Sequence, residues 1–288
     1  MTQQVRPDFD RIRAARNETR SAERLAAHFD VESCLARQLA ASRKQDRSTL
    51  YSDVYRQLFA SVEDHPQHRG STSVRQDRLR MQLGFLRRML RPADTYVEIG
   101  CGDAALTKAV APFVAHSVGV DVTPELIGMD GVLPSFRYLN TDGTTLDLRD
   151  GSVDLVYSNQ LMEHLHVEDA AEQLQEVFRV LKPGGRYVCS TPNRLTGQHD
   201  ISCYFRYEPA GFHMREYDHR SLARLFREVG FTGVVGSVTA KGMTVSLPLA
   251  IIAPVEAMFE RLPVRLRARI ALLPIVFNTA GVTLIGTK

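Results

Sequence analysis

Apolar runs and helical stripes alternate along most of the chain. Several short apolar runs have the length of buried strands, and segments with helical spacing of apolar positions follow them. This alternation predicts an α/β fold with a mostly parallel sheet covered by helices on both faces. The expected strands are 95–99, 116–120, 136–140, 153–158, 186–190, 231–238 and 281–286, and the helices between them are 103–113, 167–181 and 221–229.

The first ninety residues follow a different pattern. They are rich in Arg, Ala, Glu and Leu and poor in Gly and Pro. Their apolar spacing predicts helices within 8–46, at 48–62 and at 73–90. Residues 1–91 are therefore expected to form an N-terminal helical cap, and residues 92–288 the domain that contains the sheet.

The segment 240–280 separates the last two expected strands. Its apolar stretches are broken by prolines, and Arg265, Arg267 and Arg269 give it a basic side. This composition predicts a helical insert before the last strand. It is compatible with a peripheral membrane contact. It is also compatible with a helical pair packed on the sheet edge, a pocket lid or a homodimer contact, and we favour these three over the membrane contact.

Composition narrows the class of protein. The chain has 288 residues, of which 44% are hydrophobic and 24% charged, as in ordinary globular proteins. Its N-terminal residues lack the apolar core of a secretory signal, and no apolar run reaches the ~20 residues of a transmembrane helix. Its four cysteines are scattered, so we expect neither a metal site nor a disulfide framework, and a cytoplasmic location fits.

Charge is distributed unevenly. Residues 1–91 hold 18 Lys and Arg against 11 Asp and Glu, a net charge of +7, whereas the rest of the chain is acidic. A basic segment can contact nucleic acid. The arginines alternate with acidic and apolar residues, however, which is typical of solvated helix faces, so a nucleic-acid partner is not expected.

A glycine turn follows the first expected strand. The run from Tyr96 to Ile99 ends at Gly100 and Gly102, and Asp103 can cap the helix that follows. Strand, glycine turn and helix in this order suit a dinucleotide or S-adenosylmethionine (SAM), or no ligand at all. Glu98 favours SAM, because a carboxylate would repel a pyrophosphate and attract the ammonium group of SAM.

Polar residues stand at the ends of the next strands. Asp121 ends the second strand, 21 residues after Gly100, where a carboxylate can accept hydrogen bonds from a ribose. Ligands of open α/β sheets bind outside the carboxyl ends of the strands, so these loops should face one crevice. The candidate cofactor-binding residues are Glu98, Gly100, Gly102, Asp121, Val122, Asp142, Gly143, Asn159, Gln160 and Leu161.

Several landmarks together resemble a known family. The segments 98–102, 118–121, 147–156, 163–165, 181–185 and 211–217 resemble, in this order, motifs of the class I SAM-dependent methyltransferases. The resemblance covers about residues 92–238 and is strongest to small-molecule methyltransferases related to ubiquinone-pathway enzymes. It implies a Rossmann-like, doubly wound sheet with an antiparallel last strand, SAM as cofactor, and Asp142 near the adenine. Ala104 departs from the pattern, which has a third glycine there.

The same resemblance implies methyl transfer to a small molecule, a sugar or a glycan precursor, most simply to a hydroxyl. Histidine suits the removal of a hydroxyl proton at neutral pH, and His213 lies in a loop rich in aromatic residues. We expect His213 to be the general base, with His164 as the alternative. We also expect the helices at 48–62 and 73–90 to cover the crevice.

Other functions remain open at this stage. They are an RNA methyltransferase, an NAD(P)-dependent oxidoreductase and a non-enzymatic binding module on the same fold.

Overall fold

The sheet arrangement confirms the predicted fold. The computed structural model describes residues 3–65, 72–128, 133–240, 243–273, 276 and 281–288. Its eight strands pair in the order β3-β2-β1-β4-β5-β8-β6-β7, with β1 to β5 parallel and β8 antiparallel between β5 and β6. The strands are β1 (Thr95–Ile99), β2 (His116–Asp121), β3 (Phe136–Asn140), β4 (Val153–Asn159), β5 (Leu181–Thr191), β6 (Thr232–Ala240), β7 (Met243–Leu247) and β8 (Val282–Thr287).

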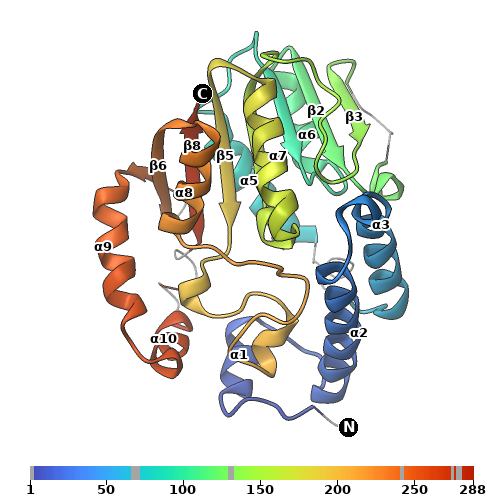
Figure 1. Ribbon diagram of the computed structural model, residues 1–288, viewed down its shortest axis with the longest axis vertical. Helices are drawn as coiled ribbons and strands as arrows, with labels where there is room; N and C mark the ends of the chain where they lie inside the picture. Colours follow the sequence, from blue (N-terminus) through green and yellow to red (C-terminus); the bar gives the residue numbers. More distant parts are fainter. Residues whose placement is uncertain (1–2, 66–71, 129–132, 241–242, 274–275, 277–280) are drawn as a thin grey trace.

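Helices cover both faces of the sheet, because alternate strand residues point to opposite faces. Val97 and Ile99 of β1 pack in the core beneath α7 (Val167–Val180) and α8 (His219–Val229). Tyr96 of β1 packs on the opposite side with α5 (Thr72–Leu86) and α6 (Ala105–Val110). Figure 1 shows α7 and α8 in front of the strands and α5 behind them.

The N-terminal helices lie beyond the carboxyl end of β5 (Figure 1). They are α1 (Phe9–Ala15), α2 (Ala22–Ala40) and α3 (Lys44–Ser61), so the predicted helical region 8–46 contains two helices and the start of a third. Phe9 and Phe29 of this group pack on the segment that follows β5, in a small core of their own. The short 3-10 helices of the chain are η1 (Ala111–Phe113), η2 (Pro124–Leu126), η3 (Met162–His164), η4 (Arg194–Thr196) and η5 (Ile201–Tyr204).

Helix α5 does not join this group. Its Leu79, Leu83 and Leu86 pack with Tyr96 of β1 and Leu106 of α6 in the core of the rear sheet face. The expectation that residues 73–90 cover the crevice is therefore wrong for these side chains, because their apolar stripe is used by the sheet.

The region before the last strand contains more than the expected helices. Strand β7 pairs with β6 as a hairpin at the sheet edge and was not predicted, and α9 (Leu249–Glu260) and α10 (Val264–Ala271) follow it. Glu256 of α9 accepts from the Asn193 amide (2.7 Å) and pairs with the His219 ring (2.8 Å), which fastens α9 to the domain. A membrane contact or homodimer contact of this segment stays a prediction. None of the described helices is both long and apolar enough to cross a membrane.

A buried ion pair fastens α3 to α7. The Arg47 side chain is 2% exposed, and its Nε and Nη2 atoms donate to the two carboxylate oxygens of Asp169, both at 2.8 Å. The Tyr51 hydroxyl donates to the same carboxylate (2.7 Å) and accepts from the backbone N–H of His166 (2.8 Å). Paired guanidinium and carboxylate groups with further hydrogen bonds can be buried, whereas either one alone is costly.

We expect Arg47→Ala to lower the free energy of unfolding by about 3–5 kcal/mol, because it leaves the Asp169 carboxylate buried without its cation. Urea unfolding measures the change. Arg56→Ala on the same helix is the control, since Arg56 forms an exposed pair with Asp53 that should be worth less than about 1 kcal/mol. Equal losses in the two variants would contradict the role given to Arg47.

Candidate active site

The glycine turn after β1 has the backbone that its sequence predicts. Gly100 and Gly102 have φ values of +72° and +54°, which favour glycine. A Cβ at Gly100 would lie 3.1 Å from the Leu161 side chain, so the turn is also sterically closed to larger residues. Ala104 has a φ of +57° and precedes α6. Asp103 is therefore not the N-cap residue, although its carboxylate accepts from the N–H of Ala105 (3.1 Å).

Asp121 connects the end of β2 to this turn. Its Oδ2 accepts from the Gly102 N–H (2.8 Å), and its Oδ1 accepts from the N–H (3.0 Å) and the hydroxyl (2.6 Å) of Thr123. A carboxylate has about four acceptor positions, so Oδ2 keeps room for one more donor. The residue therefore both holds the turn and presents an acceptor at the strand ends.

A small cavity of about 50 Å³ lies at the carboxyl ends of the strands, as predicted for the crevice. Tyr51 and Tyr55 of α3 form part of its wall. The Tyr51 ring lies 3.0 Å from the point where a Cβ of Gly143 would be. The predicted residues that the structure brings together in this wall are Gly100, Asp121, Val122, Gly143, Leu161 and His164; Ile99, Thr141, Leu165 and Gln173 complete it and were not predicted.

Glu98 does not line this cavity. It belongs to the buried part of β1, and its carboxylate accepts from the Thr107 hydroxyl of α6 (2.5 Å). Burial raises the pKa of Glu98 to about 8, and the hydrogen bond from Thr107 only partly opposes this effect. The structure therefore gives Glu98 a partner in α6 and places no atom of it in the cavity wall.

Other predicted residues also lie elsewhere. Asn159 lines a different cavity beside α5, and Gln160 is exposed with a φ of +55°. Gly102 is absent from the cavity wall, although its N–H is held by Asp121. The Asp142 carboxylate closes its own turn: burial raises its pKa, but hydrogen bonds from Thr145 and Thr144 outweigh this and lower it.

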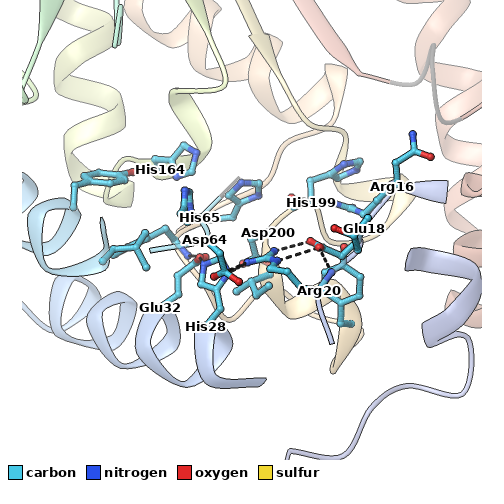
Figure 2. A pocket seen from close by; sticks show the side chains of 18 of the residues that line it. Arg16, Glu18, Arg20, His28, Glu32, Asp64, His65, His164, His199 and Asp200 are labelled. Carbon is cyan, nitrogen blue, oxygen red and sulfur yellow. Dashed lines mark hydrogen bonds and ion pairs between the residues drawn. The ribbon is translucent and has the colours of Figure 1, made fainter. Parts of the chain in front are cut away.

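A second cavity of about 760 Å³ adjoins the first, and Tyr55 and His164 line both. Figure 2 shows its side chains converging from α2, from the segment before it and from the loop after β5. Its wall is rich in ionisable side chains of both signs. Those labelled in the figure are Arg16, Glu18, Arg20, His28, Glu32, Asp64, His65, His164, His199 and Asp200.

The structure brings the two predicted catalytic histidines together. The rings of His164 and His213 meet edge to face with centroids 4.8 Å apart. Burial lowers the pKa of His164 to about 3, so this imidazole is neutral at neutral pH. Burial also lowers the pKa of His213, but its hydrogen bond to Glu216 (2.6 Å) and the nearby Glu163 carboxylate outweigh this and raise it to about 9.

A raised pKa favours the protonated form of His213 at neutral pH, so this ring would have to lose a proton before it could act as a general base. The catalytic role of His213 stays a prediction. Two carboxylates of the site, Glu163 and Glu216, were not predicted. Both are fully or almost fully buried beside the histidines. Their positions in the sequence could have indicated them, because Glu163 directly precedes His164 and Glu216 follows His213 by three residues.

Comparisons with known proteins agree with this fold. Residues 97–189 match a family model described as a methyltransferase domain. The chain is 33% identical over 137 residues to a probable S-adenosylmethionine-dependent methyltransferase of Mycolicibacterium smegmatis, over 47% of this chain and 51% of that protein. It is 31% identical over 105 residues to a ubiquinone biosynthesis O-methyltransferase of Methylococcus capsulatus, over 34% and 43% of the two chains.

A solved structure extends the likeness to most of the fold. A chain of the Haloferax volcanii complex between the Trm112 methyltransferase activator and its methyltransferase partner aligns with a TM-score of 0.52 at 20% identity, over 73% of this chain and 90% of that one. This likeness concerns the fold. The match over residues 97–189 and the fold confirm the predicted resemblance to the class I SAM-dependent methyltransferases. It spans about half the length of the curated relatives named above.

The raised pKa of Glu98 predicts a pH-dependent stability. The folded protein holds the Glu98 proton more tightly than the unfolded chain, so the free energy of unfolding falls as pH rises from about 4.5 to about 8. Glu98→Gln resembles the protonated side chain and does not titrate. We expect the variant to gain stability relative to the native protein over this window, by up to about 1.4 kcal/mol per pH unit.

Urea unfolding at several pH values measures this difference. Glu125→Gln, at an exposed carboxylate on η2, is the control and should show no such trend. A Glu98→Gln difference that does not change with pH would contradict the raised pKa.

Proposed function

We propose that the protein is a SAM-dependent methyltransferase that methylates a hydroxyl of a polar small molecule, such as a sugar or a glycan precursor. One observation carries the proposal. The cavity at the glycine turn and the larger polar cavity share the wall formed by Tyr55 and His164. A cofactor in the first cavity and an acceptor in the second would meet at this wall, as in-line transfer requires.

The residues of the small cavity suit the parts of SAM. The turn at Gly100 and Gly102 offers a close backbone approach, and Oδ2 of Asp121 can accept a hydrogen bond from a ribose hydroxyl. The small cavity, however, measures about 50 Å³, whereas ligand pockets usually measure about 300–1,000 Å³, so it is too small for SAM as it stands. Helix α3 must therefore shift, and Tyr51 withdraw from Gly143, when the cofactor binds.

The larger cavity favours a polar acceptor. Charged side chains of both signs and five imidazoles line it, and shielding such groups from water with a ligand that cannot hydrogen-bond to them is costly. Hydroxyl groups can donate to the carboxylates and accept from the guanidinium groups. The relative named as a ubiquinone biosynthesis O-methyltransferase supports oxygen as the acceptor atom.

The direct test is mass spectrometry of a panel of sugars and other hydroxylated metabolites incubated with the protein and SAM. A product heavier by one CH₂ group, formed together with S-adenosylhomocysteine, is expected. If only amines gain the mass, the acceptor class is wrong; if SAM binds and no acceptor reacts, the binding-module alternative is favoured.

Asp121→Ala should weaken SAM binding. Loss of a hydrogen bond to a charged acceptor costs roughly 1.5–3 kcal/mol, which corresponds to a tenfold or greater loss of affinity. Calorimetry measures this, with thermal unfolding to show that the variant is folded. Glu125→Ala, just beyond the same strand, is the control and should bind normally. Normal binding by folded Asp121→Ala would remove Asp121 from the cofactor site.

Bound SAM should also slow backbone hydrogen exchange in α3. Tyr51 and Tyr55 of this helix line the small cavity, so ligand contacts would stabilise the helix in its closed position. Exchange followed by mass spectrometry should show protection within 48–60 and none in α9, which does not line either cavity. Equal exchange of 48–60 with and without SAM would show that α3 does not contact the cofactor.

A further inference from the structure

Three potential metal ligands converge at the wall between the two cavities. Glu163 and His164 belong to η3, and His213 comes from the loop after β5. Each offers one ligand atom, and these atoms all lie within 4.8 Å of one another. Segments almost fifty residues apart in the sequence thus bring two imidazoles and a carboxylate to one point.

Two atoms of this cluster have no protein partner. Oε1 of Glu163 and Nδ1 of His164 are buried and make no hydrogen bond within the described part of the chain. Glu163 is fully buried. Leaving a buried acceptor without a partner typically costs about 1–3 kcal/mol, so such atoms in a native fold call for a ligand.

The other polar atoms of the three side chains form hydrogen bonds to neighbouring residues. Oε2 of Glu163 accepts from the Thr191 hydroxyl (2.8 Å), and Nδ1 of His213 is paired with Oε1 of Glu216 (2.6 Å). The ring of His164 hydrogen-bonds to the backbone of Phe212. Metal-binding histidines usually donate their second ring N–H to a carboxylate or a carbonyl in this way.

We propose that Glu163, His164 and His213 bind a divalent transition-metal cation, which in turn binds the acceptor hydroxyl. Oε1 of Glu163, Nδ1 of His164 and Nε2 of His213 would be its ligands, and His213 would release its Nε2 proton when the cation binds. Two imidazoles and one carboxylate suit Zn²⁺, Fe²⁺ or Co²⁺ better than Mg²⁺, which prefers oxygen ligands. Three protein ligands leave coordination positions open, and the carboxylates of Glu163 and Glu216 balance the charge of the cation.

This inference rests on the proposed function and explains how the acceptor loses its proton. A cation bound to the acceptor oxygen lowers the pKa of the hydroxyl. The O–H bond breaks and its proton leaves to solvent. The oxygen lone pair then forms the new O–CH₃ bond while the S–CH₃ bond breaks, leaving S-adenosylhomocysteine with the electron pair on sulfur.

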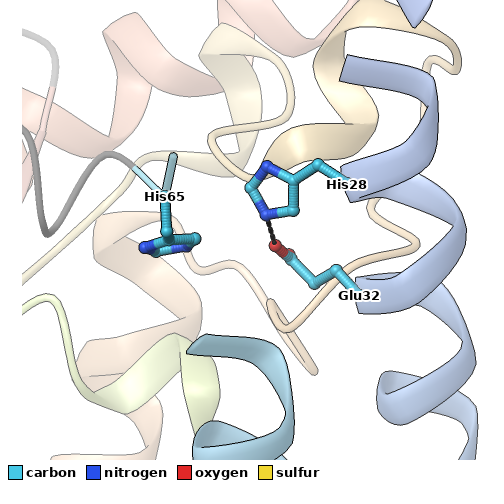
Figure 3. Close-up of side chains that lie close together, drawn as sticks. All are labelled: His28, Glu32 and His65. Carbon is cyan, nitrogen blue, oxygen red and sulfur yellow. Dashed lines mark ion pairs between the residues drawn. The ribbon is translucent and has the colours of Figure 1, made fainter. Parts of the chain in front are cut away.

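A second cluster in the larger cavity provides a contrast. His28, Glu32 and His65 also lie within reach of one ion (Figure 3). Nη1 of Arg20, however, lies 3.0 Å from Nδ1 of His28. A guanidinium can only donate, so Nδ1 of His28 accepts and the ring hydrogen is on Nε2, which lies 2.9 Å from Oε2 of Glu32. The ring has no lone pair for a metal, and this cluster serves as the internal control.

The experiment uses metal-free full-length protein without SAM, titrated with Co²⁺ and followed by its visible absorption, and with Zn²⁺ followed by calorimetry. We expect one ion per chain. Glu163→Gln and His164→Gln should lose at least 100-fold in affinity, and Glu216→Gln, which acts through His213, about 10–100-fold. Glu32→Gln should bind the ion normally. Thermal unfolding verifies that each variant is folded, and Glu163→Gln is close in size and shape to the native residue.

The outcomes separate this site from the proposed function. No ion bound by the native protein, undiminished binding by Glu163→Gln, or loss of binding in Glu32→Gln would each overturn the site. Methyl transfer by fully metal-free protein would overturn the role of the cation and leave the proposed methyltransferase standing. One ion bound through Glu163, with SAM binding absent, would support the site and contradict the proposed function.

Discussion

The buried contact between Arg47 and Asp169 fixes the position of α3, and the cofactor cavity depends on that position. A guanidinium that is 2% exposed must be matched by a carboxylate, and Asp169 provides one from the first turn of α7, where the helix dipole favours negative charge. Tyr51 joins the same carboxylate, so the α3 face that carries Tyr51 and Tyr55 is held over Gly143 and the ends of the strands. One side of the cofactor cavity is thus set by residues outside the matched methyltransferase domain.

This arrangement couples cofactor binding to a local rearrangement. The Tyr51 ring forms part of the cavity wall against Gly143, and the residue cannot move without weakening its hydrogen bonds to Asp169 and His166. Under the proposed function, part of the binding energy of SAM is therefore used to displace α3. The affinity for SAM should reflect this helix as well as the glycine turn, and substitutions in α3 that touch no ligand atom can change it.

The sequence predicts the sheet well because its signals are local. Apolar runs, the glycine turn and Asp121 act over a few residues, and Gly100, Asp121 and Gly143 line one small cavity at the strand ends. The wrong predictions concern contacts between segments that are far apart in the sequence. Glu98 points to α6 because it shares a strand face with Tyr96, and which helix covers that face is decided by tertiary packing. Strand β7 was missed because edge pairing with β6 is a non-local contact.

The catalytic role of His213 and His164 stays a prediction. The two rings lie together beside the larger cavity, but their protonation depends on side chains from other segments. Glu216 and Glu163 raise the pKa of one ring, while burial lowers that of the other. Two equivalent residues in a sequence thus acquire opposite charge states. Such a difference arises only once the loop after β5 packs against η3.

Most of the larger cavity lies outside the segment that matches the family model. The family model covers residues 97–189, and of the side chains that line the larger cavity only His164 falls inside that range. The others come from the N-terminal helices, α5 and the loop after β5. Similarity to methyltransferases therefore supports the proposal for the small cavity, where the cofactor would bind. The names of relatives carry no information about most of the larger cavity, where the acceptor would bind. That selection follows from the chemistry of the wall, where charges of both signs and several imidazoles favour a polar ligand with many hydrogen-bonding groups.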